Sequence, residues 1–404
     1  MTNKTMSKKL FIISGEPSGD LHGSNLIKAL RRQLPDVEIV GMGGDLMRQS
    51  GAKLFYDIKD ISVIGFAEVI KKLSLYKKIF KELSERLEVE KPDAVILIDY
   101  PGFNLRFARQ AKNRAIPVIY YISPQVWAWN KGRIKTIKRF VDKMLVLFDF
   151  ERQLYQQHGM DAIFVGHPLV EAVKTSMSKQ DAIKYFGLDP DKKIIALLPG
   201  SRKTEVKNIL PIMLKSAQIL ARNAIPPHPF PLPIGERVKG EGNTHNHPFQ
   251  FLLIKSPIIN QNVYDNLIKN YNLLITIINN NRYDAIACCD FALTASGTAT
   301  LETAILGIPM ALVYKVSFAT WLIARLLIKI PYIGLVNVVA GEKIVPEFIQ
   351  FGARPEKIAA ECLDILNSPK RNAIIQSKLA QVKEKLGPPG ASSKAAQEIL
   401  DFLS

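Results

Sequence analysis

Short runs of β-branched and aliphatic residues, each followed by a helical pattern, constrain the fold of this chain more than any other feature. Four of these runs are Leu10 to Ser14, Ala94 to Ile98, Pro117 to Ile122 and Ile194 to Leu198. Brief apolar runs that alternate with helices indicate βαβ units on a buried parallel sheet, so the predicted fold class is α/β. Ligands bind at the carboxyl ends of such strands, and functional residues are therefore expected directly after them.

The length of 404 residues predicts two such domains, because a single hydrophobic core seldom grows that large. The run at Ile194 opens a second set of units and indicates a boundary between residues 170 and 190. We assign residues 1–175 to an N-terminal domain, 176–365 to a C-terminal domain and 366–404 to terminal helices.

Residues 225–249 interrupt this pattern with many prolines, glycines and polar residues, which is typical of a flexible surface insertion. Three histidines lie there, His228, His245 and His247. A His-x-His pair without cysteine partners is not a zinc-ligand pattern, so no metal is predicted.

The net charge of +17 indicates an anionic partner: a nucleic acid, a phosphorylated small molecule or an acidic membrane surface. Cys288 and Cys289 are adjacent and Cys362 is distant, which excludes a disulfide framework and indicates a reducing compartment. The N-terminal apolar run breaks too early for a signal peptide, and no run reaches the ~20 residues of a spanning helix. We expect a soluble or peripheral protein.

The first apolar run leads into Gly15-Glu16-Pro17-Ser18-Gly19-Asp20, ahead of a helical pattern from Leu21 to Leu30. Glycines permit tight turns, and the amides of a helix N-terminus attract anions. The segment is either a ligand loop, with Gly15, Glu16, Ser18 and Gly19 as contacts, or an ordinary βα turn.

Asp99 and Asn104 follow the second run. A carboxylate at the end of a buried strand needs a partner, so Asp99 is interpreted as a helix cap or as a catalytic carboxylate. Asn104 either caps a helix from Leu105 onward or binds a sugar hydroxyl.

The third run is followed by Gln125, Trp127 and Trp129, and then by a strongly basic segment. Its cations are Lys131, Arg133, Lys135, Lys138, Arg139 and Lys143. Tryptophans beside cations suit sugar stacking with phosphate capture, a membrane interface or a nucleic-acid strand. No nucleic-acid binding module is recognised, so nucleic acid is not expected as the partner.

Two segments of the second half suit a diphosphate. Gly200, Ser201 and Arg202 follow a strand, and Arg202 offers a forked, permanent cation or a surface ion pair. Ser296, Gly297 and Thr298 precede a helix whose amides can hold phosphates without a metal. Glu302, in the first turns, either accepts hydrogen bonds from ribose or favours the helix dipole.

Two helical patterns leave a choice between core and membrane. Val69, Leu73, Tyr76, Phe80, Leu83 and Leu87 form one apolar stripe with lysines beside it. Residues Phe318 to Ile328 are apolar on most sides. Each helix is either packed in a core or lies at a membrane interface.

As a set, seven motifs resemble the lipid-A-disaccharide synthases in order and spacing, over nearly the whole chain except the insertion. They are SGEPSGD, IDYPGFN, SPQVWAWNKGR, FVGHPLVE, LPGSRKTEV, ASGTATLETAILGIPM and NVVAGEKIVPE. The resemblance implies a GT-B fold, with two Rossmann-like domains facing a central cleft and the C-terminal helices packing back on the N-terminal domain. It also implies a cytoplasmic enzyme, peripheral on the inner membrane, without a cofactor; a homodimer stays open.

The implied reaction joins UDP-2,3-diacylglucosamine to 2,3-diacylglucosamine 1-phosphate with inversion. The resemblance makes Asp99 the general base, with His22 as the alternative. It assigns the donor UDP to Arg202, to the amides from Ser296 to Thr298 and to Glu302, and it expects Asn337, Glu342 and Lys343 in the same cleft.

Two features depart from the family pattern: Gly102, where an acidic residue is usual, and the insertion. Gly102 puts a secondary contact in doubt, and an insertion between βα units is tolerated if it loops out. The rival interpretations are a UDP-GlcNAc 2-epimerase, the transferase that makes lipid II, or a non-catalytic lipid or nucleotide-sugar binding protein.

Overall fold

The structure is a computed structural model that describes residues 8–61, 69–128, 132–223, 248–327 and 330–404. The chain divides into two compact units. Unit 1 consists of residues 1–168 and 386–404, and unit 2 of residues 169–385. Of the predicted insertion, only Pro248 and Phe249 belong to the described ranges, and Phe249 begins a strand.

Unit 1 is built on a seven-stranded parallel sheet with the strand order β3-β2-β1-β4-β5-β6-β7. Its strands are β1 (Lys9–Ser14), β2 (Glu38–Gly43), β3 (Lys53–Asp57), β4 (Ala94–Ile98), β5 (Val118–Tyr121), β6 (Lys143–Val146) and β7 (Ala162–Phe164). Its helices are α1 (Pro17–Gln33), α2 (Asp45–Gln49), α3 (Ile58–Ile61), α4 (Val69–Glu90), α5 (Pro101–Lys112), α6 (Arg133–Phe140), α7 (Asp149–Gln157) and α18 (Ala391–Leu403).

Unit 2 has a six-stranded sheet of the same type, with the strand order β10-β9-β8-β11-β12-β13. The strands are β8 (Lys193–Leu198), β9 (Phe249–Ile254), β10 (Ile275–Ile278), β11 (Phe291–Ala295), β12 (Met310–Tyr314) and β13 (Glu347–Ile349). The helices are α8 (Leu169–Ala172), α9 (Lys179–Tyr185), α10 (Lys203–Asn223), α11 (Gln261–Ile268), α12 (Arg282–Ala287), α13 (Thr298–Ile305), α14 (Phe318–Leu327), α15 (Leu335–Ala340), α16 (Pro355–Asn367) and α17 (Pro369–Lys385), with a 3-10 turn, η2 (Gln350–Gly352).

Each sheet reverses its winding at one place, between β1 and β4 in unit 1 and between β8 and β11 in unit 2. In open parallel sheets the crevice beyond the strand ends at such a switch point is the usual ligand site. The motifs after Ser14, Ile98, Leu198 and Ala295 all lie at these two points. The predicted α/β class is confirmed, and the topology marks the same loops as the motifs do.

The described members of the apolar stripe in α4 pack in the core of unit 1. Leu83 and Leu87 are buried, and the Phe80 ring contacts Phe103 of α5 edge-on at 5.2 Å. The side chains of Val69 and Leu73 lie outside the described residues. Burial of this face is the expected outcome for an amphipathic helix on a sheet.

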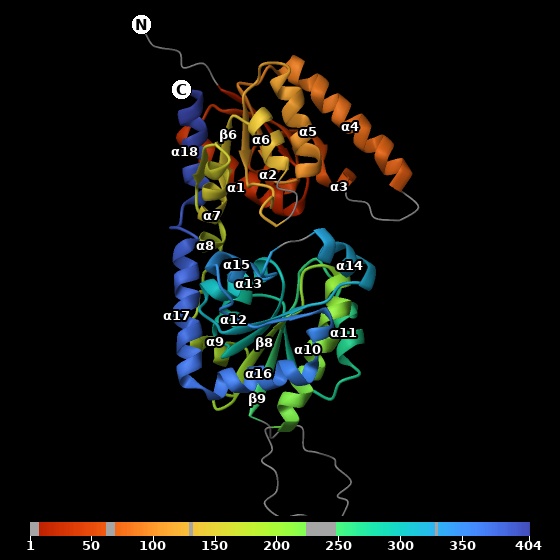
Figure 1. Ribbon diagram of the computed structural model, residues 1–404, viewed down its shortest axis with the longest axis vertical. Helices are drawn as coiled ribbons and strands as arrows, with labels where there is room; N and C mark the ends of the chain where they lie inside the picture. Colours follow the sequence, from red (N-terminus) through yellow and green to blue (C-terminus); the bar gives the residue numbers. More distant parts are fainter. Residues whose placement is uncertain (1–7, 62–68, 129–131, 224–247, 328–329) are drawn as a thin grey trace, which may run out of the picture. The chain divides into compact units, whose positions relative to one another are not determined.

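The C-terminal helices separate between the two units, whereas the sequence assigns residues 366–404 to the N-terminal domain as one block. Helix α17 packs on α13, α15 and α16 in unit 2. Only α18 returns to unit 1, where it lies along α1 (Figure 1). Small buried residues, Ala391, Ala395 and Ala396, allow this close packing.

Candidate active site

The two loops at the unit 1 switch point lie against each other. Ser14 pairs with Ile98 in the sheet, which brings Gly15 next to Tyr100. A Cβ atom on Gly15 would lie 2.2 Å from the Tyr100 ring, so this contact requires glycine. Glu16 is near enough to raise the pKa of Asp99. The predicted residues Gly15, Glu16 and Asp99 therefore come together.

Asp99 follows β4 in a strained backbone conformation that its neighbours hold in place. Asp99 and Tyr100 have φ values of 45° and 47°, in the left-handed region. The Asn104 side-chain amide donates to the carbonyl oxygens of Ile98 at 3.1 Å and Asp99 at 2.7 Å. The Tyr120 hydroxyl also donates to the Asp99 carbonyl. These bonds hold the main chain at Asp99 in its left-handed conformation.

Asn104 thus has a different position from either prediction. Helix α5 begins at Pro101 rather than near Leu105, so Asn104 lies inside the helix and is not its cap. Its side chain is fully buried, and its amide nitrogen points to the backbone carbonyls of Ile98 and Asp99 rather than to a ligand. Gly102 is exposed, with no atom within 4 Å of a Cβ placed on it.

Burial, together with the nearby Glu16 charge, raises the pKa of the Asp99 carboxyl to about 6, although a hydrogen bond from the Tyr100 backbone lowers it. At neutral pH the group is therefore mostly ionised, yet it binds a proton far more readily than an ordinary aspartate. This is the property that a general base needs near pH 7.

His22 has the opposite shift. Burial lowers its pKa to about 4, and its Nδ1 atom is buried without a hydrogen-bond partner in the described part of the chain. The His167 ring is tilted against Phe148 at 5.2 Å, and His167 is close enough to His22 for the His22 charge to lower the pKa of His167. A neutral imidazole in this place is a weaker base than Asp99.

The first glycine-rich motif begins its helix earlier than its sequence pattern predicts. Helix α1 starts at Pro17 rather than Leu21, which puts Ser18, Gly19 and Asp20 in its first turn. Ser18 is exposed, and Gly19 packs beside the Ser14 hydroxyl. Buried Asp20 accepts hydrogen bonds from the amides of residues 44, 46 and 47 and so caps α2.

Glu151 is a buried carboxyl in this region that the sequence motifs do not reveal. It caps α7 by accepting from the Phe148 amide at 3.3 Å and is 3% exposed. Burial raises its pKa to about 8, although the backbone of residues 147 and 148 and the Trp127 indole lower it. Trp127 itself lies edge-on to Phe150 at 5.5 Å. Gln125 is exposed, and Trp129 lies outside the described residues.

In unit 2 the loop after β8 holds Arg202 near the switch point. Gly200 has φ of 110°, and a Cβ there would lie 2.6 Å from Glu205. The Glu205 carboxylate accepts from the amides of Ser201 at 3.1 Å and Arg202 at 3.2 Å. These two amides are therefore occupied. The Arg202 side chain is 76% exposed and pairs with the Glu205 carboxylate at 3.7 Å, which is the surface ion pair that the sequence leaves as the alternative to a ligand contact.

The loop after β11 leads into α13 at the same switch point. Gly297, with φ of 114°, precedes the helix, and Thr298 is exposed at its first position. The Ser296 hydroxyl donates to the carbonyl of Ile333 at 3.2 Å. The first amides of a helix have no partner within it, so this end of α13 suits a phosphate.

Glu302 lies one turn further along α13 and is 7% exposed. Its carboxylate accepts from Arg282 at 2.6 Å and from the Tyr283 hydroxyl at 3.3 Å. Burial raises its pKa, and these two neighbours lower it. The helix-dipole explanation is therefore incomplete, because specific side chains hold this carboxylate.

The motif around Asn337 has a structural role. Fully buried Asn337 donates to the carbonyl of Val345 and to Glu347, and it accepts from the amides of residues 344 and 345. Glu347 in turn accepts from the amides of Ile333 and Gly334, the segment that Ser296 contacts. Asn337 therefore shapes the loop beside Ser296, in place of the predicted donor contact.

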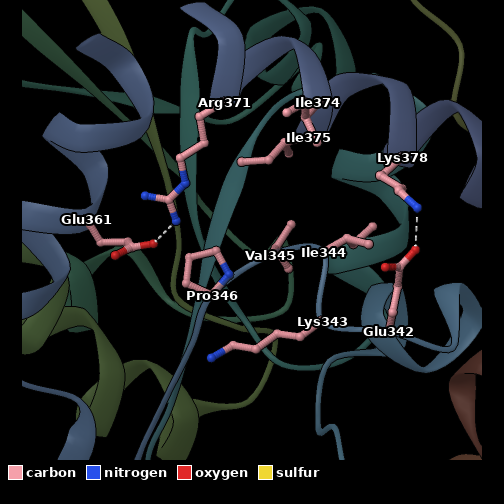
Figure 2. A pocket seen from close by; sticks show the side chains of 10 residues that line it. All are labelled: Glu342, Lys343, Ile344, Val345, Pro346, Glu361, Arg371, Ile374, Ile375 and Lys378. Atoms are coloured by element: carbon pink, nitrogen blue, oxygen red, sulfur yellow. Dashed lines mark hydrogen bonds and ion pairs between the residues drawn. The ribbon is translucent and has the colours of Figure 1, made fainter. Parts of the chain in front are cut away.

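Glu342 and Lys343 line a separate pocket of about 400 Å³ against α16 and α17. Figure 2 shows Glu342 paired with Lys378 and Arg371 paired with Glu361. Among described residues, neither the 200–202 loop nor the 296–302 segment lines this pocket. That Glu342 and Lys343 also line the cleft of the diphosphate loops stays a prediction.

Two parallel-sheet α/β units with these strand orders correspond to the GT-B fold. The fold resembles the calicheamicin glycosyltransferase (TM-score 0.61, 13% identity, 98% of both chains). It also resembles the UDP-GlcNAc 2-epimerase of Neisseria meningitidis bound to UDP-GlcNAc (TM-score 0.58, 13% identity, 97% of this chain and 100% of that one). At this identity the likeness concerns the fold alone.

Sequence comparison then gives the family. The model of the lipid-A-disaccharide synthetase family matches residues 10–234 and 242–400. The lipid-A-disaccharide synthase of Syntrophus aciditrophicus is 45% identical over 398 residues, 98% of each chain, and that of Coxiella burnetii is 36% identical over 397 residues, 98% of this chain and 99% of that one. The chain belongs to the lipid-A-disaccharide synthases, and it is a glycosyltransferase of lipid A disaccharide synthesis.

Proposed function

We propose that this enzyme joins UDP-2,3-diacylglucosamine to 2,3-diacylglucosamine 1-phosphate, giving a β-1′,6-linked disaccharide 1-phosphate and UDP. The observation that carries the mechanism is Asp99, a largely buried carboxylate with a pKa of about 6 on a hydrogen-bonded backbone at the unit 1 switch point. It is the group best suited there to activate a sugar hydroxyl.

In the proposed step, the Asp99 carboxylate accepts the proton of the acceptor's 6-hydroxyl while that oxygen bonds to C1 of the donor sugar. The bond between C1 and the β-phosphate oxygen breaks with its electron pair, and UDP leaves. One displacement converts the α-linked donor into a β-linked product.

Asp99→Asn tests this assignment, because it removes the base and retains the shape. Product formation, followed by mass with the two acylated substrates, should fall at least about a hundredfold, as loss of a general base does. His22→Gln is the matched variant and should keep most of the activity. If Asp99→Asn stays active and His22→Gln does not, His22 is the base.

The UDP moiety is proposed to bind at the unit 2 switch point, with its diphosphate at Arg202 and the first amides of α13 and its ribose at Glu302. Arg202 is exposed and permanently charged, and the first amides of a helix such as α13 lack acceptors within that helix. Arg202→Ala should weaken UDP binding about tenfold by calorimetry. Lys207→Ala, at an exposed site on α10, is the control, and equal affinity in both variants would remove Arg202 from the site.

We also propose that the enzyme works on the cytoplasmic face of the inner membrane, docked through an exposed aromatic cluster in unit 2. Phe318 and Phe351 are 61% and 65% exposed, and both contact Trp321, at 5.8 and 5.4 Å. Arg325 lies over the Trp321 ring, and no acidic residue occurs between Glu302 and Glu342. Aromatic rings flanked by cations suit an anionic lipid surface. Within the described ranges, no helix is long and apolar enough to span a bilayer.

Flotation with phosphatidylglycerol-containing vesicles tests this surface. The double variant Phe318→Ser/Phe351→Ser should float less than the parent protein. Ile258→Ser, which changes an apolar residue that is 81% exposed elsewhere in unit 2, should float equally well. Unchanged flotation of the double variant would exclude the aromatic cluster as the docking surface.

A further inference from the structure

The Glu302 carboxylate is held by two consecutive residues at the start of α12. Arg282 donates to one carboxylate oxygen at 2.6 Å and Tyr283 to the other at 3.3 Å. The Arg282 side chain is 41% exposed, and its Nε atom is buried without a hydrogen-bond partner among the described residues. In the conformation that binds Glu302, Arg282 therefore leaves its Nε hydrogen-bond donor without an acceptor among the described residues.

We propose that Arg282, assisted by Tyr283, is the positioning residue that presents Glu302 as an acceptor for the two ribose hydroxyls of the donor. This inference rests on the proposed function, in which Glu302 binds the ribose. An ionised carboxylate has about four acceptor positions. Arg282 and Tyr283 use one on each oxygen, so each oxygen keeps another position for one hydroxyl of the vicinal pair.

The surroundings give Arg282 a second effect, on the charge of Glu302. Burial raises the pKa of Glu302, and Arg282 is the strongest opposing influence, followed by Tyr283. Of the elements packed on α13, α15 carries no charged side chain, and α8 contributes an acid, Glu171. Helix α17 carries Lys370, Arg371, Lys378, Lys383, Glu384 and Lys385. Of these, Arg371 binds Glu361 and Asp364, Lys378 binds Glu342, and Lys385 binds main-chain carbonyls. Within the described ranges, Arg282 is thus the cation that favours ionised Glu302.

The test is the pH dependence of UDP binding, measured by calorimetry from about pH 6 to about pH 8.5. A shift of one unit in the pKa of Glu302 corresponds to about a tenfold change in UDP affinity where the group is protonated. Arg282→Gln should bind UDP much more weakly than the parent at the acidic end and nearly as well at the alkaline end, because Glu302 then ionises at higher pH. Tyr283→Phe should shift the curve less. Arg222→Gln, at an exposed site on α10, should follow the parent protein.

Glu302→Gln separates this inference from the function on which it rests. The amide cannot ionise, so its curve reports the titration of UDP itself. If Glu302→Gln binds UDP as tightly as the parent at every pH, Glu302 is not a ribose ligand and the proposed function fails at this residue. A second outcome is that Glu302→Gln binds UDP weakly, while the UDP affinity of Arg282→Gln is either unchanged or reduced by the same factor at every pH. In that case the role of Arg282 is refuted and that of Glu302 stands.

Discussion

Replacing Asp99 by Asn should stabilise the fold while it abolishes turnover. The change removes a buried charge, keeps the shape and suits the left-handed backbone, which asparagine tolerates. The pKa of Asp99 rises from an ordinary 3.8 to about 6. Since one pKa unit corresponds to about 1.4 kcal/mol, the ionised group destabilises the folded state by up to about 3 kcal/mol at pH 7. We expect a net gain of about 1–3 kcal/mol, because the amide loses part of the hydrogen bond from Tyr100.

The sign of the effect depends on pH in a defined way. A carboxyl with a raised pKa in the folded state lowers stability above that pKa and has no effect below its unfolded pKa. The advantage of Asp99→Asn should therefore be full at pH 7 and vanish as the pH falls from about 6 to 3.8.

Urea unfolding of both proteins at pH 7 and at about pH 4 measures this difference. Asp36→Asn, at an exposed position of unit 1, is the control and should be neutral at both pH values. Equal stability of Asp99→Asn and the parent at pH 7 would refute the electrostatic reasoning. So would a gain that persists unchanged at about pH 4, because the Asp99 carboxyl is then protonated in the folded state and its electrostatic penalty has almost vanished.

Three further predictions concern the same unit. The value of kcat/KM should fall below about pH 6 as Asp99 takes up a proton, and a pH profile that stays flat into acid would contradict its role as base. The free energy of unfolding of Glu151→Gln in urea at pH 7 should lie within about 1 kcal/mol of the parent value, because Glu151 with a pKa of about 8 is already neutral there. Glu151→Ala should lose about 2–3 kcal/mol of this free energy, and equal losses in the two variants would show that the side-chain contacts do not matter. Asp20→Ala leaves three amides of α2 unpaired and should cost about 2–4 kcal/mol, whereas a change below about 0.5 kcal/mol would mean that solvent replaces this cap.

The sequence predicts the switch-point loops well because apolar runs and glycines are local signals. The strands before Asp99 and Gly200 are recognisable from their own residues. Helix starts are less well predicted, although Pro17 and Pro101 carry the signal of proline in a first turn.

The partners of polar residues are not predictable in the same way. Asn104 and Asn337 look like ligand residues in sequence, yet tertiary contacts bury both. Glu151 and Arg282 follow the short strands β6 and β10. The expectation that functional residues come after strands would find them if those four-residue strands were recognised. The hydrogen-bond partners of a polar side chain are often residues far apart in the chain, and the local sequence around that side chain does not reveal them.

The return of α18 to unit 1 has a consequence for how the protein is made. The whole of unit 2 lies between Pro168 and Leu386 in the chain, so it emerges from the ribosome as one continuous stretch. The strands of unit 1 are synthesised before unit 2, but the face of α1 that α18 covers stays open until residues 391–403 have been synthesised. During translation, the unit that holds Asp99 is therefore started before unit 2 and completed after it.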